Sequence, residues 1–343
     1  MNDNQVEYSE NEEELFEHYR IQADPGQEPL RIDKFLMDRI PNTSRTKLQD
    51  AAIEGNIRVN DKKVKANYKV KPSDDIAIVL PYPKREIELI PEDIPLEILY
   101  EDDYMIILNK AANMVVHPGY GNYSGTMVNA LIHHFDNLPE AEGAIPGRPG
   151  LVHRLDKNTT GVMVIAKTER ALANLSLQFF ERTIDRRYVA LAWGDIEEDG
   201  MIEGHIGRSL KNRKVMSVFP EGEYGKEART GYKVLERLTY VTLVECKLET
   251  GRTHQIRAHF QHINHPLFND PDYGGNKIIK GTQFSKYKQF VMNNFDMIPR
   301  QALHARKLEL THPHTGVRMN FESEIPEDLN SVLVRWRNYI SHR

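Results

Sequence analysis

Apolar residues early in the chain recur with two different periods, which predict the helices and strands of a small unit. In the stretch RIDKFLMDRI the apolar positions follow the spacing of one face of a helix. These positions are Ile32, Phe35, Leu36 and Ile40. A second helix is expected from about Ser44, with Thr43 or Ser44 as its N-cap, and the alternating runs NIRVND and DIAIVL predict strands. We therefore expect a compact α/β segment over residues 21–80.

A mixed pattern of strands and helices follows from Leu96 onward. LEILYEDDYMIILNK predicts two strands around an Asp-Asp turn, and GTMVNALIHHF predicts a helix. VMVIAK, ERALANLSLQFFERT and RRYVALAWG then predict a strand, a helix and a strand. In THQIRAHFQH a helix is expected to begin with Thr253 as its N-cap. This second region extends over residues 96–343.

Two further segments flank and separate these regions. Four prolines predict an interdomain linker over residues 81–95. They are Pro81, Pro83, Pro91 and Pro95. Residues 1–17 hold seven acidic residues and no lysine or arginine. Residues 1–20 are therefore expected to form an acidic disordered tail.

Composition narrows the class of protein. A chain of 343 residues has the length of about two domains, and 40% hydrophobic and 28% charged residues are ordinary for a globular protein. No run of about 18 apolar residues occurs, and the N-terminus lacks the basic and apolar parts of a signal peptide, so no membrane segment is expected. The single cysteine, Cys246, excludes an intrachain disulfide and a multi-cysteine zinc site. A reducing, cytoplasmic location is expected.

The charge is distributed unevenly. The net charge of −5 disfavours a nucleic-acid partner, but the acidic N-terminal residues account for more than all of it. Between Arg31 and Lys71 there are eleven basic and five acidic residues. Such a local basic region suits RNA, because phosphate contacts are short-range; a solvated lysine-rich turn is the alternative. The residues expected to contact RNA here are Arg31, Lys34, Ser44, Arg45, Lys47 and Lys62.

The order of residues in this basic segment resembles a known RNA-binding module. The matching stretch is RIDKFL…TSRTKLQDAAIEGNIRVNDKKVKANYKVKPSDDI. It is similar to the S-four domain, first named in a small-subunit ribosomal protein, and the resemblance implies RNA binding. One departure is Ser73-Asp74, where the family usually has Gly-Asp, so the shape of that turn stays open.

The stretch HRLDKNTTG places one carboxylate, Asp156, in a loop directly before the predicted strand VMVIAK. A solvated turn and a catalytic nucleophile are both consistent with this position. A nucleophilic carboxylate must be ionised, and a facing arginine favours the ionised form in a dry pocket. Arg154 lies two residues away, and Arg257, expected one turn into a helix, is a second partner. A structural Asp–Arg pair is the alternative.

Six stretches in register resemble the RluA/RluD family of pseudouridine synthases. They are LNKAANMVVHPGYGNYSGTMVNALIHH, GLVHRLDKNTTGVMVIAKT, RRYVALAWG, LETGRTHQIRAHF, HPLFNDPDYGG and RQALHARKLELTHPHTG. The resemblance extends from about Pro91 to the C-terminus, and the S-four-type domain in front matches the RluD-like branch. It implies an α+β fold with a mixed, largely antiparallel central sheet and flanking helices. It also implies an isomerase that converts uridine in RNA to pseudouridine.

The resemblance assigns roles to individual residues. Asp156 aligns with the nucleophilic aspartate, and Arg257 aligns with the arginine that pairs with it. Tyr188, in RRYVAL, aligns with the tyrosine that stacks on the flipped base and assists proton removal. Arg154 aligns with the arginine that contacts RNA and holds the flipped base.

Departures from the family pattern are modest. NKAAN stands where NKPAG is usual, so Ala111 and Asn113 replace a proline and a glycine. The shape of that turn is therefore open. Thr160 replaces a common serine and keeps the hydroxyl group.

The implied reaction consumes no water and changes no oxidation state, so no cofactor and no metal are expected. A hydrolytic glycosidase would need two carboxylates, and the signature around Asp156 offers one. The target base must be flipped out of its stack, and stacking on Tyr188 would return roughly 1–3 kcal/mol.

Histidines around HFQHINH are a weak candidate for a metal site. Three-residue steps drift around a helix, and no carboxylate or cysteine completes the set. The histidines are His254, His259, His262 and His265. We expect structural or RNA-facing roles for them, with His254 among the RNA-contacting residues.

The resemblance implies ribosomal RNA as the partner, of the large subunit or its precursor particle, and we expect a monomer. Two alternatives are a non-catalytic RNA-binding or ribosome-assembly factor and a hydrolase of nucleosides or glycosides. Attack at ribose C1′ and attack at uracil C6 both stay open.

Overall fold

The computed structural model describes residues 15–40, 43–80, 89–119, 121–135, 138–139, 149–212, 214–282 and 284–342. The chain divides into two compact units, the first within residues 1–88 and the second within residues 89–142 and 146–343. Part of the predicted linker, residues 81–88, lies outside the described residues, and residues 89–96 contain no helix or strand. None of the helices in the described ranges combines the length and apolarity needed to cross a bilayer.

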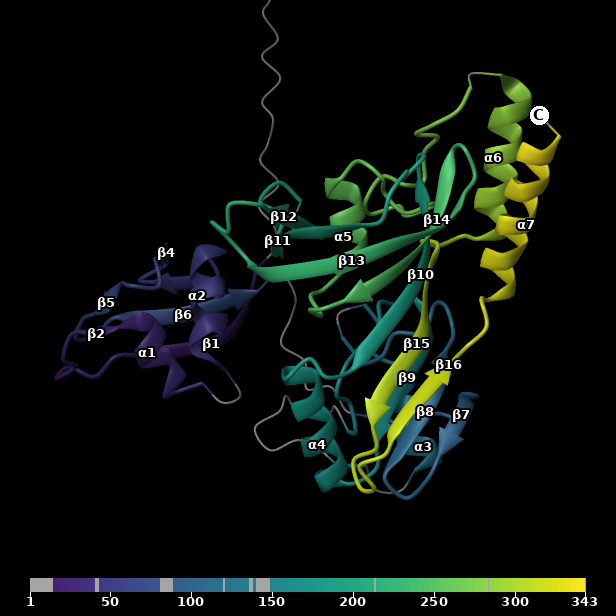
Figure 1. Cartoon of the computed structure of the whole chain (residues 1–343). Coiled ribbons are helices and arrows are strands. Elements are labelled where there is room, and N and C mark those ends of the chain that lie inside the picture. Colours follow the sequence, from purple (N-terminus) through teal and green to yellow (C-terminus); the bar gives the residue numbers. More distant parts are fainter. Residues whose placement is uncertain are drawn as a thin grey trace, which may run out of the picture. The chain divides into compact units, whose positions relative to one another are not determined.

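The first unit contains two short helices and two small sheets (Figure 1). Its elements are β1 (Phe16–Gln22), β2 (Leu30–Arg31), α1 (Ile32–Met37), α2 (Arg45–Ile53), β3 (Ile57–Val59), β4 (Lys62–Lys63), β5 (Lys69–Val70) and β6 (Asp75–Leu80). Four strands form an antiparallel sheet in the order β1-β6-β3-β4, and β2 pairs with β5. The predicted helices and strands of this segment are present.

The core of the first unit explains why α1 and α2 form. The four apolar residues at helical spacing in and just after α1 are buried, and they pack with apolar residues of α2, β3 and β6. Ser44 is the N-cap of α2, since its side chain accepts a hydrogen bond from the Lys47 amide at 3.3 Å. Full burial of one such apolar side chain is worth roughly 1.5–3 kcal/mol.

The prediction of a disordered tail over residues 1–20 is wrong at its C-terminal end, because β1 begins at Phe16. The strand pairs with β6 from Phe16 to Gln22, and Tyr19 and Ile21 pack against the core of the unit. The acidic residues obscured this alternating pattern, in which polar Glu17 and Arg20 are exposed. Residues 1–14 of the predicted tail lie outside the described residues.

The second unit is built on a ten-stranded sheet. Its strands are β7 (Glu97–Glu101), β8 (Met105–Lys110), β9 (Thr160–Ala166), β10 (Asp185–Trp193), β11 (Gly200–Arg208), β12 (Met216–Phe219), β13 (Lys226–Arg237), β14 (Val241–Leu248), β15 (Leu303–Thr311) and β16 (Arg318–Glu322). The order is β12-β11-β13-β14-β10-β15-β9-β8-β7, with β16 paired to β15. Of these pairs, β9–β15 is parallel and the others are antiparallel. The predicted mixed, largely antiparallel sheet is confirmed.

Helices cover this sheet. They are α3 (Met127–His134), α4 (Glu169–Phe180), α5 (Gln255–His262), α6 (Ser285–Met297) and α7 (Glu327–Ser341). Figure 1 shows α6 and α7 side by side, and the Phe290 and Trp336 rings pack edge to face between them, 4.9 Å apart. The central strand β10 separates two cores, because successive side chains of a strand point to opposite faces. Val189 and Trp193 join the core under α6 and α7, whereas Tyr188 and Ala190 join the core that contains α5.

The predicted N-cap of α5 is wrong by one residue. His254, not Thr253, is the N-cap, in the left-handed region with φ 53° and without a side-chain capping bond. The Gln255 Oε1 accepts a hydrogen bond from the Arg252 amide at 2.9 Å and so fixes the loop before the helix. In this conformation the His254 side chain faces the loop that precedes β9.

Candidate active site

Asp156 lies in the loop that leads into β9. Leu155 is buried in the core and anchors the loop, while the Asp156 side chain keeps 18% of its surface exposed. The Thr159 amide donates to the Asp156 carbonyl at 3.1 Å and closes a tight turn. The carboxylate is therefore held at the surface of a cavity on a fixed backbone.

Three side chains from elsewhere in the second unit hold this turn, two of them through its backbone. The Lys110 Nζ donates to the Lys157 carbonyl at 2.9 Å, and the Arg300 Nη1 donates to the Asn158 carbonyl at 3.2 Å. The Gln301 Nε2 donates to the Thr159 hydroxyl at 3.2 Å. Residues at the end of β8 and directly before β15 thus fix the position of Asp156.

Lys110, at the end of β8, is buried with an exposed fraction of 1%. Its Nζ donates to the carbonyls of Ala111, Met114 and Lys157 at 2.7–2.9 Å, which uses the three N–H groups of an ammonium. Burial lowers the pKa of Lys110 to about 7, and the nearby Asp156 carboxylate opposes that shift.

Arg257, in the first turn of α5, binds three carboxylates with one guanidinium. Its Nη1 lies 3.2 Å from Oδ2 of Asp156. Its Nε and Nη2 form a forked pair with Asp270 at 2.7 and 2.8 Å, and Nη2 also contacts Asp272 at 2.6 Å. Burial alone would lower the pKa of Arg257, but the hydrogen bonds and charge of Asp270 and the charge of Asp156 outweigh it and raise the pKa. The guanidinium therefore stays charged beside Asp156.

Tyr273 and His254 complete the surroundings of this pair. The Arg257 guanidinium lies 4.9 Å from the centre of the Tyr273 ring. The Tyr273 hydroxyl accepts from the Met216 amide at 2.9 Å, so its own hydrogen is available for Nδ1 of His254 at 3.0 Å. His254 Nε2 faces Oδ1 of Asp156 at 3.9 Å. Burial lowers the pKa of His254, although the Asp156 charge opposes the shift, and the ring is neutral at neutral pH.

Tyr188 lies on the face of β10 that borders the same cavity. Its side chain is 7% exposed. Burial raises the pKa of the phenol, with the Arg186 charge opposing and the Asp156 charge adding to the rise. The phenol is thus protonated at neutral pH.

Two cavities of the second unit meet at Asp156. One has a volume of about 450 Å³ and is bordered by Tyr188, and the other has a volume of about 780 Å³. Both are bordered by Arg154, Asp156, His254 and Arg257. Their size falls in the range of about 300–1,000 Å³ typical of small-ligand sites.

The predicted site residues fall into two groups. Asp156, Tyr188, Arg257, Arg154 and His254 lie together around these cavities, and the Arg154 side chain is exposed. The predicted RNA-contacting residues of the basic segment lie in the first unit. They are Arg31, Lys34, Ser44, Arg45, Lys47 and Lys62.

Within the first unit, Asp33 organises two of these basic residues. Asp33 is fully buried and accepts from Arg31 at 2.9 Å and from Arg45 at 3.0 Å, while both guanidinium groups stay 40–44% exposed. The Arg31 bond outweighs burial and lowers the pKa of Asp33 below its usual range. Lys34 and Lys62 are exposed. A solvated basic face is thus fixed around one buried carboxylate.

Sequence reasoning missed several residues that hold the site. Asp270, Asp272 and Tyr273 all contact Arg257, and Lys110 and Arg300 fix the loop of Asp156. The signal was available in NDPDYGG, where two carboxylates precede an aromatic residue. No local pattern could show that this stretch folds against the helix that begins at Gln255.

Three of the four histidines considered as metal ligands have separate partners. His259 Nδ1 contacts the Thr230 hydroxyl at 2.9 Å, and His265 Nδ1 contacts the Trp193 carbonyl at 2.7 Å. His254 contacts Tyr273, and His262 is exposed.

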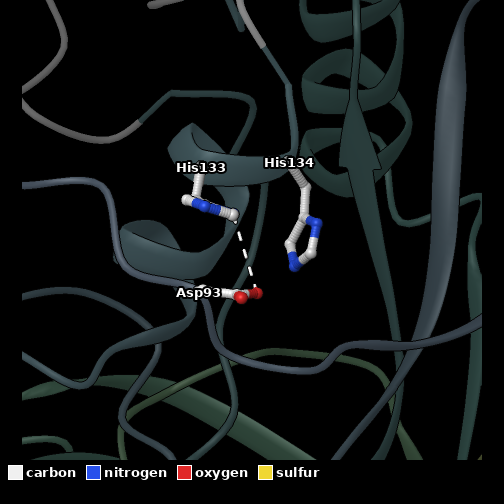
Figure 2. Close-up of side chains that lie close together, drawn as sticks. All are labelled: Asp93, His133 and His134. Carbon is white, nitrogen blue, oxygen red and sulfur yellow. Dashed lines mark ion pairs between the residues drawn. The ribbon is translucent and has the colours of Figure 1, made fainter.

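Another group with the geometry of possible metal ligands involves Asp93, His133 and His134 (Figure 2). Figure 2 shows His133 directed at Asp93, and the closest approach of this pair is 3.9 Å. His134 Nε2 lies 3.0 Å from the Ile94 carbonyl oxygen. All three side chains are exposed, and exposed acidic groups are common without a bound ion.

Comparisons with known proteins agree with this arrangement. Residues 104–262 match the family model of RNA pseudouridylate synthase, and residues 30–76 match the S4 domain. An uncharacterized RNA pseudouridine synthase of Chlorobaculum parvum is 45% identical over 317 residues, which cover 92% of this chain and 96% of the relative. The chain belongs to the RNA pseudouridine synthase family. The predicted family is therefore confirmed, and this protein is an isomerase that acts on uridine in RNA.

Other relatives carry a more specific name. The ribosomal large subunit pseudouridine synthase D of Nitrosomonas europaea is 42% identical over 309 residues, covering 90% of this chain and 85% of the relative. The protein of the same name in Escherichia coli is 40% identical over 305 residues, covering 88% and 89%. Human RNA pseudouridylate synthase domain containing 4 shares the fold, with a TM-score of 0.51 and 23% identity over 70% of this chain and 93% of its own.

Proposed function

We propose that this RNA pseudouridine synthase modifies uridines of large-subunit ribosomal RNA and that Asp156 is its nucleophile. The observation that carries the proposal is the position of the Asp156 carboxylate where two cavities meet, paired with the buried Arg257 at 3.2 Å. A carboxylate with a buried cationic partner stays ionised and can bond to an electrophilic carbon.

The covalent step needs this charge in either of its possible routes. The Asp156 oxygen bonds to ribose C1′ as the glycosidic bond to N1 breaks, or it adds to uracil C6 before that bond breaks. The uracil then turns and C5 bonds to C1′. The bond between Asp156 and C1′ or C6 breaks and releases the carboxylate, C5 loses its proton and N1 gains one. Atoms and electrons balance without water, an oxidant or a reductant.

Tyr188 and Arg154 have supporting roles in the proposal. The Tyr188 ring borders the cavity and is proposed to stack on the flipped uracil, a contact worth roughly 1–3 kcal/mol. Its phenol is the group proposed to take part in proton removal at C5. Arg154 is exposed beside Asp156 and is proposed to hold the flipped nucleotide by its phosphate.

Positioning is the proposed function of the groups behind Asp156. Arg257 cannot move freely, because two of its other bonds hold it to the fully buried Asp270. His254 is proposed to be a neutral neighbour of the carboxylate that contacts RNA and does not neutralise the nucleophile.

The choice of large-subunit RNA is supported by the names of two relatives that align over most of this chain. In the first unit, the RNA contacts are proposed to come from Arg31, Lys34, Ser44, Arg45, Lys47 and Lys62. A hydroxyl engaged in capping, as in Ser44, can still donate its hydrogen to a phosphate.

The test uses unmodified transcripts of large-subunit and small-subunit ribosomal RNA. After incubation with the full-length protein, pseudouridines are mapped by carbodiimide modification. We expect new sites in the large-subunit transcript and none in the other. Sites confined to small-subunit RNA would refute the proposed target. Release of free uracil would favour a hydrolase, for which Asp272 would be the second carboxylate.

A further inference from the structure

Besides Arg154 and Arg257, three arginines border the 450 Å³ cavity, and none of these three has a carboxylate partner in the described part of the chain. We call Arg182, Arg186 and Arg252 the arginine cluster. Arg182 follows α4, Arg186 lies on β10, and Arg252 lies in the loop before α5. Among the described residues, no carboxylate lies within 4.0 Å of any of these guanidinium groups. The contact of Arg252 is with the Glu227 carbonyl, at 2.9 Å from its Nε.

The neighbouring Arg187, on the same strand, is neutralised by two carboxylates. Arg187 forms ion pairs with Asp185 at 2.9 Å and with Glu245 at 2.7 Å. Because side chains alternate along a strand, Arg186 points to the opposite face, the one that Tyr188 shares. The Nε of Arg186 is buried and has no hydrogen-bond partner in the described part of the chain. A buried donor without a partner is costly unless a ligand satisfies it.

The cluster is also electrostatically unfavourable when empty. Burial lowers the pKa of Arg186 and of Arg252, and the positive charge of Arg182 lowers both further. Because arginine is not deprotonated in proteins, an anion in the cluster would relieve both the repulsion and the loss of solvation. Gly251 leaves room for this arrangement, because a Cβ at that position would lie 2.8 Å from Nη1 of Arg186.

An exposed aromatic ring lies beside the cluster. Phe180, the last residue of α4, borders the same cavity and is 83% exposed. It is the most exposed large apolar side chain in the described ranges. The preceding Phe179 has a different role, since its ring stacks on His153 and lies 5.5 Å from the Arg186 guanidinium. Core packing therefore explains Phe179 but not Phe180.

We propose that the arginine cluster binds a phosphodiester of the RNA strand next to the target uridine and that Phe180 stacks on an unpaired base beside it. Cationic groups that follow the backbone, with an aromatic ring on which any base can stack, are the usual means of binding single-stranded RNA. The inference rests on the proposed function, because it assumes that the target uridine enters this cavity. It implies that the neighbour of the target is unpaired when bound.

The experiment measures binding of the full-length protein to labelled single-stranded oligouridylate at several KCl concentrations. Phe180→Ala and Arg182→Gln are compared with two matched controls. Phe284→Ala removes a ring that is 76% exposed at the start of α6, and Arg170→Gln removes an exposed arginine at the start of α4. Neither control residue borders the cavity.

We expect Phe180→Ala to weaken binding by roughly 5- to 150-fold, the range for loss of one stacked base. We expect Arg182→Gln to lower the slope of log K against log salt by about 0.7, the value for one phosphate contact with a single strand. The controls should bind as the wild type does. Affinities and slopes of Phe180→Ala and Arg182→Gln equal to those of the controls would overturn the inference.

Arg186→Gln provides an independent arm, since glutamine keeps a donor but not the charge. It should also lower the salt slope, with the fluorescence unfolding curve checked to show that it folds. Pseudouridine formation by each protein separates the two proposals. If the wild type forms pseudouridine and the variants bind RNA as tightly as it does, only this binding site is refuted. If the wild type forms no pseudouridine but the variants bind more weakly than it does, only the proposed function is refuted.

Discussion

At the scale of single residues, Arg257 is the fixed cationic partner of the Asp156 carboxylate. One planar guanidinium binds Asp270 in a fork and still reaches Asp156 and Asp272. A lysine offers a point charge without this fork and could not make the same set of contacts. The nucleophile is therefore proposed to depend on an arginine that is itself fixed by a buried carboxylate.

Replacing Arg257 should destabilise the second unit. In Arg257→Met the fully buried Asp270 loses its partner, and an unpaired buried charge costs roughly 3–5 kcal/mol. The free energy of unfolding is measured with urea. Fluorescence reports on this unit alone, because both tryptophans of the chain, Trp193 and Trp336, belong to its core. An unchanged free energy of unfolding would contradict the assigned pairing. The stability of Arg257→Lys should lie between those of the wild type and Arg257→Met.

Tyr188→Phe tests the proposed division between stacking and proton removal. The ring remains, so RNA affinity should change by no more than a few fold. Loss of the phenol should lower the single-turnover rate by roughly 10²–10⁴-fold, the usual contribution of a positioned proton-transfer group. A rate equal to that of the wild type would leave stacking as the role of Tyr188.

At the scale of elements, the sequence predicted those features that follow from local patterns. The helical spacing around Phe35, the strand after Asp156 and the helix carrying Arg257 are all present. β1 was missed because its alternating apolar residues lie directly after a dense acidic stretch. Lys110 was missed because its partners are backbone carbonyls, which no side-chain motif reveals.

The departures from the family pattern have structural explanations. Asn113 and Ser73, which stand where glycine is usual, have φ angles of 62° and 63°. Asparagine adopts this left-handed conformation more readily than other residues, and serine does so at a cost. The hydroxyl of Thr160 lies 2.9 Å from Nδ1 of His304, across the parallel pair β9–β15. Only the fold brings these two residues together, so the sequence could not show why a hydroxyl is needed.

Buried histidines should make the second unit sensitive to acid. Burial is the main cause that lowers the pKa of His304 and His259 to about 4 and that of His153 to about 3. The unfolded histidines have an ordinary pKa of about 6.5. Between pH 6.5 and about 4, the unfolded state therefore takes up protons that the folded state does not, and stability decreases as the pH is lowered.

His304→Gln isolates one of these groups. Each such proton contributes a slope of roughly 1.4 kcal/mol per pH unit. Between pH 6.5 and 4, the free energy of unfolding of the variant should change with pH by about 1.4 kcal/mol per pH unit less than that of the wild type. Above pH 7 the two proteins should show the same dependence on pH. Urea unfolding followed by tryptophan fluorescence measures both slopes. An identical slope in the variant and the wild type would contradict the assignment of His304 as buried and neutral.

At the scale of the whole molecule, an acidic chain carries two separate basic regions. One is the face around Asp33 in the first unit, and the other borders the cavity of Asp156. The net charge of −5 is therefore no guide to the surface that meets RNA.

The contribution of the first unit can be measured with a double variant. Lys34→Gln with Lys62→Gln should lower the salt slope of binding to large-subunit RNA by about 1.4–1.8, since each phosphate contact contributes about 0.7–0.9. The control is Lys286→Gln with Lys288→Gln, which removes two exposed lysines of α6. Equal slopes for the two double variants would exclude these lysines from the RNA interface.

The central claim is that Asp156 acts as the nucleophile and is more than one of several negative charges around Arg257. Its most direct test is pseudouridine formation in unmodified large-subunit ribosomal RNA by Asp156→Asn and Asp272→Asn. Both variants remove one carboxylate from the same guanidinium, and Asp272 is 48% exposed. We predict no pseudouridine with Asp156→Asn, although it binds the RNA within a few fold of wild type, and turnover within about tenfold of wild type with Asp272→Asn. Turnover by Asp156→Asn at the wild-type rate would contradict the account.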